Sequence, residues 1–155
     1  AFTITPSRAA ARLNSGVRSA GRIMAIVYKG SCLCGQVRYS IAGEINDVSH
    51  CHCSMCRKAH GAAFATYANV ASDSHCFEQG ADLLRVFNSS GSTDRVFCSL
   101  CGSPMLWCNK TEFPGIASFP LNSLDTPFNP SAERHIFVGS KAPWHQIDNS
   151  WPQSE

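Results

Sequence analysis

Nine cysteines lie along this 155-residue chain, most of them in close pairs and one close triplet. An odd number of cysteines in such groups is a poor framework for disulfides, because two cysteines one residue apart would close a strained ring if bridged to each other. Close pairs that are separated by a long stretch of chain are typical of metal sites, since one ion can gather the tips of two hairpins. The cysteine pattern therefore predicts bound metal.

The first cysteine group joins two segments that lie far apart in the sequence. Residues 30–35 (GSCLCG) supply Cys32 and Cys34, and residues 98–102 (CSLCG) supply Cys98 and Cys101. The glycine after each pair lets the chain turn back, so that backbone amides can point at the sulfurs. Four thiolates form the closed tetrahedral shell of a structural zinc ion, and loss of that ion should unfold the domain.

The second group lies in a single run, residues 49–58 (SHCHCSMCRK). Its cysteines can reach one ion from a loop and the first turn of a helix; they are Cys51, Cys53 and Cys56. Three protein ligands with one open position are the layout of a catalytic zinc, where a water can be acidified or a substrate thiol bound as thiolate. The same run also fits a structural site closed by a fourth protein ligand. The candidates for that ligand are His50, His52, His60, Cys76 and Cys108.

Other polar residues of this run are candidates for catalysis. His52 or His60 can move a proton, and Arg57 with Lys58 can lower the pKa of a thiol and attract an anionic substrate. The alternative for Arg57 and Lys58 is a solvated helix end. We take His52 and Arg57 as the candidate catalytic residues. Outside the run, Cys76 and Cys108 are interpreted as spare cysteines of the kind found in cores.

Short strands dominate the elements that must position these residues. Residues 36–41 alternate between apolar and polar, with Val37, Tyr39 and Ile41 on one face. Gly, Asn, Ser and Pro separate further strands, predicted at 64–70, 83–87, 93–97, 104–107 and 134–138. Residues 54–59 are predicted to be helical with Ser54 as the N-cap candidate, and residues 121–124 a single turn. The pattern predicts an all-β domain of short antiparallel strands, with metal sites pinning the strand ends.

The length of the chain is that of one domain with one core. The first 23 residues contain four arginines and no acidic residue, which leaves nine basic and eleven acidic residues in the remainder. Arg, Ser and Ala dominate this segment, as in organellar transit peptides, but we favour a tag or a translated upstream sequence. We interpret residues 1–23 as a tag, upstream or targeting-like segment and residues 24–155 as a single zinc-binding β domain.

The charge and the hydrophobicity of the chain limit the classes of partner that we expect. A net charge of −2 for residues 24–155 gives no electrostatic reason to expect nucleic acid or anionic lipid. No apolar run approaches the roughly 18 residues that a membrane span needs. Zinc thiolates survive best in a reducing compartment, so we expect the cytoplasm, or an organelle matrix if the N-terminal segment is a transit peptide.

Four blocks of sequence carry a family resemblance. They are G-x-C-x-C-G-x-V-x-Y at residues 30–39, C-H-C-x-x-C-R-K at 51–58, F-C-x-x-C-G-x-P at 97–104, and a tail at 134–148 that contains RHIFV, Lys141, Pro143-Trp144 and Asp148. Together they resemble the glutathione-dependent formaldehyde-activating enzyme (GFA) family, which also includes centromere-protein-V-like members. The resemblance covers residues 25–150, nearly the whole chain after the N-terminal segment.

The resemblance implies a mainly β fold of the β-tent type, with several small antiparallel sheets and a short helix. It implies two zinc ions, a structural one on Cys32, Cys34, Cys98 and Cys101, and a second one on Cys51, Cys53 and Cys56 that meets the substrate thiol. The implied activity is that of a carbon–sulfur lyase-like enzyme, which handles the adduct of glutathione or a similar thiol with formaldehyde or another small aldehyde. Residues 61–67 and Trp144 are candidates for the pocket lining.

Two other functions are compatible with the same residues. One is a non-catalytic zinc scaffold or binding module, which should close the second site with a fourth protein ligand. The other is hydrolysis of a C–N or C–S bond by a zinc-bound water, which would proceed without added thiol. Three anionic ligands already neutralise Zn²⁺, and this favours activation of a soft thiol over formation of a strong hydroxide nucleophile.

Overall fold

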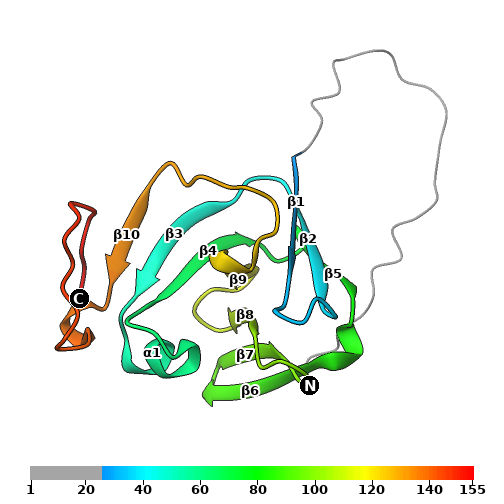
Figure 1. Ribbon diagram of the computed structural model, residues 1–155, viewed down its shortest axis with the longest axis horizontal. Coiled ribbons are helices and arrows are strands. Elements are labelled where there is room, and N and C mark those ends of the chain that lie inside the picture. The colour runs from blue at the N-terminus through cyan, green and yellow to red at the C-terminus, as the bar shows by residue number, and fades with distance from the viewer. Residues whose placement is uncertain (1–25) are drawn as a thin grey trace, which may run out of the picture.

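The computed structural model describes residues 26–155, so the tag, upstream or targeting-like segment at 1–23 lies outside the described residues. Within the described range the chain is mainly β, as predicted, with one short α-helix and three 3₁₀ turns. The strands form one sheet of three and one of seven (Figure 1). The more specific β-tent description stays a prediction. None of the helices in this range is both long and apolar enough to cross a membrane.

The three-stranded sheet carries the alternating face that the sequence predicts. Its strands pair antiparallel in the order β1-β2-β5, with bounds Val27–Ser31, Arg38–Ala42 and His75–Gln79. Val37, Tyr39 and Ile41 are fully buried. Gly30 lies opposite Tyr39, and a Cβ atom there would collide with the tyrosine ring and come within 2.6 Å of the Ser123 carbonyl oxygen. The close approach of these segments therefore requires glycine at position 30.

The seven-stranded sheet has the order β10-β3-β4-β9-β8-β7-β6. Its bounds are Asn46–Cys51 (β3), Ala65–Ala71 (β4), Leu84–Ser90 (β6), Thr93–Cys98 (β7), Pro104–Asn109 (β8), Ile116–Pro120 (β9) and Glu133–Ile136 (β10). The β10–β3 pair is parallel, unlike the antiparallel pairing expected throughout. The strand expected at 134–138 ends at Ile136, because Phe137 has a left-handed backbone (φ 56°) and starts the 3₁₀ turn η3, Val138–Ser140.

The two sheets share a core. Tyr39 and Ile41 of the small sheet pack with Met105 and Phe119 of the large sheet, all fully buried. Burial of one such large apolar side chain contributes about 1.5–3 kcal/mol. A 3₁₀ turn at Ala81–Leu83 (η1) joins β5 to β6, so the strand expected from residue 83 begins at Leu84.

The helix α1 spans Ser54–His60, close to the predicted 54–59. Its N-cap is Cys53 and not Ser54, because the Cys53 sulfur accepts a hydrogen bond from the Cys56 backbone N–H at 3.4 Å. Gly61 ends the helix in a left-handed conformation, φ 59°. The single turn predicted at 121–124 is the 3₁₀ turn η2, Leu121–Ser123.

Candidate metal centres

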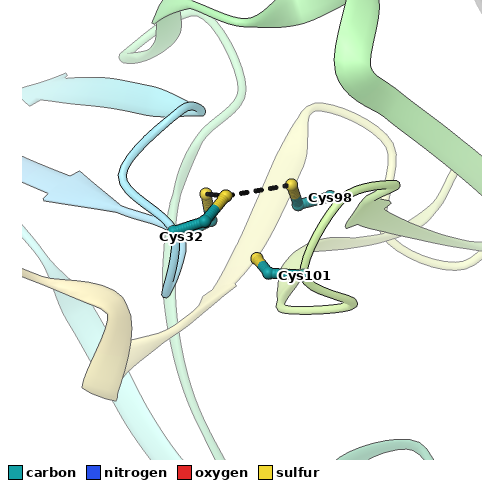
Figure 2. Close-up of side chains that lie close together, drawn as sticks. Cys32, Cys98 and Cys101 are labelled. Atoms are coloured by element: carbon teal, nitrogen blue, oxygen red, sulfur yellow. Dashed lines mark hydrogen bonds between the residues drawn. The ribbon is translucent and has the colours of Figure 1, made fainter.

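The four-cysteine centre joins the small sheet to the large one. Cys32 and Cys34 lie in the loop between β1 and β2, Cys98 ends β7, and Cys101 lies in the β7–β8 turn. Figure 2 shows Cys98 and Cys101 reaching toward Cys32 from the opposite loop. All four sulfurs lie within 4.8 Å of one another. The Sγ–Sγ distance is 3.4 Å between Cys32 and Cys34 and 3.9 Å between Cys34 and Cys98.

These distances fit a tetrahedral metal ion. Sulfurs bound about 2.3 Å from one zinc lie about 3.8 Å apart. The Val37 backbone N–H donates to the Cys32 sulfur at 3.3 Å, which is the amide contact expected around a metal-bound thiolate. Cys32 and Cys98 are buried, whereas Cys34 is exposed. The residues present can therefore hold a metal ion between the two sheets.

The three-cysteine centre lies where β3 meets α1. Cys51 ends the strand, Cys53 caps the helix and Cys56 lies in its first turn. Their sulfurs all lie within 4.8 Å of one another; Cys51 and Cys56 are buried and Cys53 is half-buried. Among residues 26–155, no His, Asp, Glu or further Cys ligand atom joins this group. The donor set fits a metal ion with three protein ligands.

Four of the five candidates for a fourth ligand to the three-cysteine centre either bond to other residues or lie elsewhere in the fold. The ring nitrogens of His50 bond to the Thr66 hydroxyl at 2.9 Å and to the Glu133 carboxylate at 2.7 Å. His60 Nε2 lies 2.8 Å from the Tyr67 hydroxyl. Of the two cysteines, Cys108 is buried in the core between the sheets and Cys76 is exposed on β5.

The fifth candidate, His52, belongs to a group of stacked rings. It is fully buried, and its Nε2 lies 2.8 Å from Nδ1 of His135. Phe64 and His145 also pack against its ring. Cys51 packs instead against a separate cluster that includes Ala65, Tyr67 and Ile136. Burial lowers the pKa of His52 to about 4, so the ring is neutral near pH 7.

Arg57 is bound to the loop that carries the cysteines. Its Nε donates to the His52 carbonyl oxygen at 3.1 Å, and its side chain is half-buried. Lys58 is exposed in the last turn of α1, where a cation interacts favourably with the C-terminal end of the helix dipole. Catalytic roles for His52 and Arg57 stay predictions.

Arg95 is a residue of this centre that the sequence analysis does not identify. It lies on β7, and its Nη2 donates to the Cys56 sulfur at 3.7 Å. Its Nε donates to the Ser89 hydroxyl at 3.1 Å. Alternation along the predicted strand at 93–97 places Arg95 and the buried Val96 on opposite faces of the sheet. No sequence signal shows that the face with Arg95 meets α1.

A cavity of about 280 Å³ adjoins the three-cysteine centre between α1 and strands β6 to β8. Its polar wall contains His60, Tyr67 and Arg95, and its apolar wall contains Phe87, Phe97 and Leu106. Tyr67 packs against Cys51 and Cys56, and Arg95 bonds to Cys56, so the wall and the centre are in contact. Burial raises the pKa of Tyr67, which keeps its hydroxyl protonated.

A second cavity, of about 320 Å³, lies on another side of His60. Ala62, Phe64, Thr66 and Asn122 line it, so most of the predicted lining segment 61–67 does border a cavity. Trp144 lines neither of these two cavities and is 73% exposed.

Comparisons with known proteins agree with this arrangement. A family model described as "Glutathione-dependent formaldehyde-activating enzyme" matches residues 27–140, which include both cysteine centres. A Halomonas elongata protein named "Putative glutathione-dependent formaldehyde-activating enzyme" is 29% identical over an alignment of 133 residues, and the match covers 80% of this chain and 83% of that protein. The crystal structure of a Rhodobacter sphaeroides protein matches with a TM-score of 0.54 and 25% identity, over 66% of this chain and 91% of that one.

Proposed function

The chain belongs to the glutathione-dependent formaldehyde-activating enzyme family, and on this premise we propose that it is a zinc-dependent enzyme of the carbon–sulfur lyase type. Its reaction joins glutathione or a similar thiol to formaldehyde or another small aldehyde, and separates them in reverse. The observation that carries the proposal is the three-sulfur group beside a cavity, with no fourth side-chain donor within residues 26–155.

Two zinc ions complete the proposed sites, one on Cys32, Cys34, Cys98 and Cys101 and one on Cys51, Cys53 and Cys56. At the three-cysteine centre zinc supplies, when bound, a soft Lewis acid with one position for a thiol sulfur. Phe87, Phe97 and Leu106 give an apolar wall to the space where thiol and aldehyde would meet.

Tyr67 and His60 are placed to transfer the proton from the thiol to the carbonyl oxygen of the aldehyde. As the carbon–sulfur bond forms, the carbonyl π bond breaks and the carbonyl oxygen takes up a proton. The Tyr67 hydroxyl can donate that proton, and His60 Nε2, 2.8 Å away, can replace it. The thiol gives its proton to His60 before this step, which makes the ring an imidazolium that can supply the proton, so the net transfer is from sulfur to oxygen. In the reverse direction the pair removes the hydroxyl proton and the thiolate leaves.

His52 and Arg57 enter the proposal as residues that position the three-cysteine loop. Arg57 holds the His52 carbonyl oxygen, and the His52 ring holds His135 on β10. The His52 backbone N–H also donates to the Ile136 carbonyl oxygen at 3.0 Å. Since His52 lies between two of the cysteines, these contacts support a fixed geometry for the sulfurs. Reduced thiolate ligands suit the cytoplasm or an organelle matrix, where we place the protein.

The test compares the native protein with Cys53→Ser and with Cys76→Ser as the matched control. Exchange NMR follows the rate at which glutathione and formaldehyde form their adduct, with and without protein. The native protein and Cys76→Ser should accelerate the exchange, because Cys76 is exposed on β5 and contacts neither centre. Cys53→Ser should lose about a hundredfold or more of the acceleration.

The other outcomes identify the alternatives. Turnover of a substrate that needs no added thiol would favour the zinc-water hydrolase. No acceleration by zinc-replete native protein, with any small thiol and aldehyde tested, would favour the scaffold or binding module.

A further inference from the structure

Arg95 is a half-buried cation in an apolar setting. Along β7, Val96 and Cys98 are buried in the core between the sheets, while Arg95 belongs to the opposite face. Its direct neighbours across the sheet are Phe87 on β6 and Trp107 on β8. Removing a guanidinium from water costs free energy unless an anion or hydrogen-bond acceptors replace the water.

The partners of Arg95 do not include a carboxylate. Nε donates to the Ser89 hydroxyl and Nη2 to the Cys56 sulfur, whereas Nη1 is buried with no hydrogen-bond partner. In the part of the chain that the structure describes, the ion pairs of acidic side chains involve other cations. Within residues 26–155, the charge of Arg95 is therefore paired with the sulfur of Cys56 and with no carboxylate.

The cavity that Arg95 borders has a positive bias. No Asp or Glu belongs to its lining, and Arg95 is the one permanently charged residue in it. A ligand there meets the Arg95 guanidinium together with the aromatic rings of Phe87 and Phe97, which line the same cavity. An anionic group on the ligand would pair with the charge of this guanidinium.

We propose that Arg95 is the specificity-determining residue of the cavity, which selects thiols that carry a carboxylate over neutral or cationic thiols. The inference rests on the proposed function, since it names the charge of the thiol handled at the three-cysteine centre. The planar fork of the guanidinium can bind a carboxylate through one nitrogen while another stays on the Cys56 sulfur.

The test measures thiol binding by calorimetry on zinc-loaded protein. The probes are 3-mercaptopropionate, 2-mercaptoethanol and cysteamine, which differ in charge and little in size. The native protein should bind 3-mercaptopropionate about tenfold more tightly than 2-mercaptoethanol, and cysteamine most weakly. Arg95→Gln should bind the three thiols within about threefold of one another, mainly through loss of affinity for 3-mercaptopropionate.

Arg85→Gln is the matched control. Arg85 lies on the neighbouring strand β6, and its guanidinium donates only to the backbone carbonyls of Asp82 and Leu84. It does not belong to the cavity lining, so this variant should keep the native preference. Arg95→Lys, which keeps the charge but loses the fork, should keep the order of the three thiols with a smaller ratio between them.

Three results would overturn the inference. The first is that the native protein shows no preference for a charge on the thiol. The second is that Arg95→Gln keeps the native preference, and the third is that Arg95→Gln lowers the affinity for all three thiols equally. If Arg95→Gln loses zinc, Arg95→Lys decides, and a flat order of affinities in that variant overturns the inference. Failure of the proposed function looks different, because zinc-loaded native protein would then bind none of the three thiols.

Discussion

Each sulfur of the three-cysteine centre is held by a different piece of local structure. Cys51 is fixed by the last pair of the β3–β4 ladder, Cys53 by its capping bond, and Cys56 by the helix itself. Cys51 is held by the strand, whereas Cys53 and Cys56 are linked through the capping bond, and serine at position 53 can accept the same bond. Single substitutions at this centre should therefore change metal binding without rearranging the loop.

Tyr67→Phe tests the proposed proton path at the scale of one atom. The change removes the hydroxyl that lies 2.8 Å from His60 Nε2 and keeps the ring that packs against the cysteines. We expect the rate of thiol–aldehyde exchange to fall about a hundredfold, with zinc content unchanged. Loss of the hydrogen bond should lower the free energy of unfolding by about 1 kcal/mol. An unchanged exchange rate in this variant would contradict the role of Tyr67.

The residues of the metal centres could be predicted because cysteine spacing is local information. Cys51, Cys53 and Cys56 lie within six positions, and the structure does bring their sulfurs together. Arg95 could not be predicted, since its contact with the centre depends on which sheet face meets α1. That choice is made by packing between residues that are about 30 to 40 positions apart in sequence.

At the scale of elements, the three-cysteine loop is supported by β10 and the C-terminal tail. β10 runs parallel to β3, and tail residues 152–154 hydrogen bond to the backbone of His135 and Val138 (Figure 1). Trp151 stacks on His50 with ring centroids 5.1 Å apart and an interplanar angle of 6°. Trp151 therefore covers His50, which precedes Cys51, and His135 on β10.

Trp151→Ala tests whether this cover stabilises the fold. Loss of the stacking and of its buried area should lower the free energy of unfolding by about 1–2 kcal/mol, measured with urea in excess zinc. The matched control is Trp144→Ala, because Trp144 is 73% exposed and, among the aromatic rings of residues 26–155, it contacts His145 alone, edge-on. The control should change stability by less than about 0.5 kcal/mol. Equal effects of the two substitutions would refute the account of the tail.

Strands with a clean apolar alternation were predictable, and β2, β4, β6, β7 and β8 lie close to their predicted positions. β3 was missed because its buried residues include Ser49 and His50, whose burial depends on partners in other strands. β9 was missed because Ala117 to Pro120 are all buried, so no alternation marks the strand. The parallel pairing of β10 follows from a long connection that carries no local signal.

At the scale of the whole molecule, two sheets are joined by a shared core and by the four-cysteine centre. The half-buried His75 of the small sheet packs beside that core, with its ring stacked on Tyr39 at 4.8 Å and near Phe119 of the large sheet. Its Nε2 is buried without a hydrogen-bond partner, and burial lowers the pKa of His75 to about 4. The contact between the sheets therefore requires a neutral ring at position 75.

His75→Phe tests the acid sensitivity of this contact. The pKa of His75 is about 4 in the folded chain and 6.5 in the unfolded chain, so between these values the unfolded chain binds the extra proton. Native stability is therefore lost as the pH falls below 6.5, by about 2 kcal/mol at pH 5. Unfolding experiments should compare the free energy of unfolding of His75→Phe with that of the native protein. The gap between the two values should widen in favour of the variant by this amount from pH 7.5 to pH 5. A gap that stays constant with pH would show that His75 does not titrate this way.

The most direct test of the account is the zinc content per chain of the native protein and of Cys53→Ser, each measured alongside its circular dichroism spectrum. We predict two zinc ions in the native protein and one in the folded variant, because the four-cysteine centre holds the sheets together without Cys53. One zinc in the native protein, or unfolding of Cys53→Ser, would contradict the account of a structural centre and a separate functional centre.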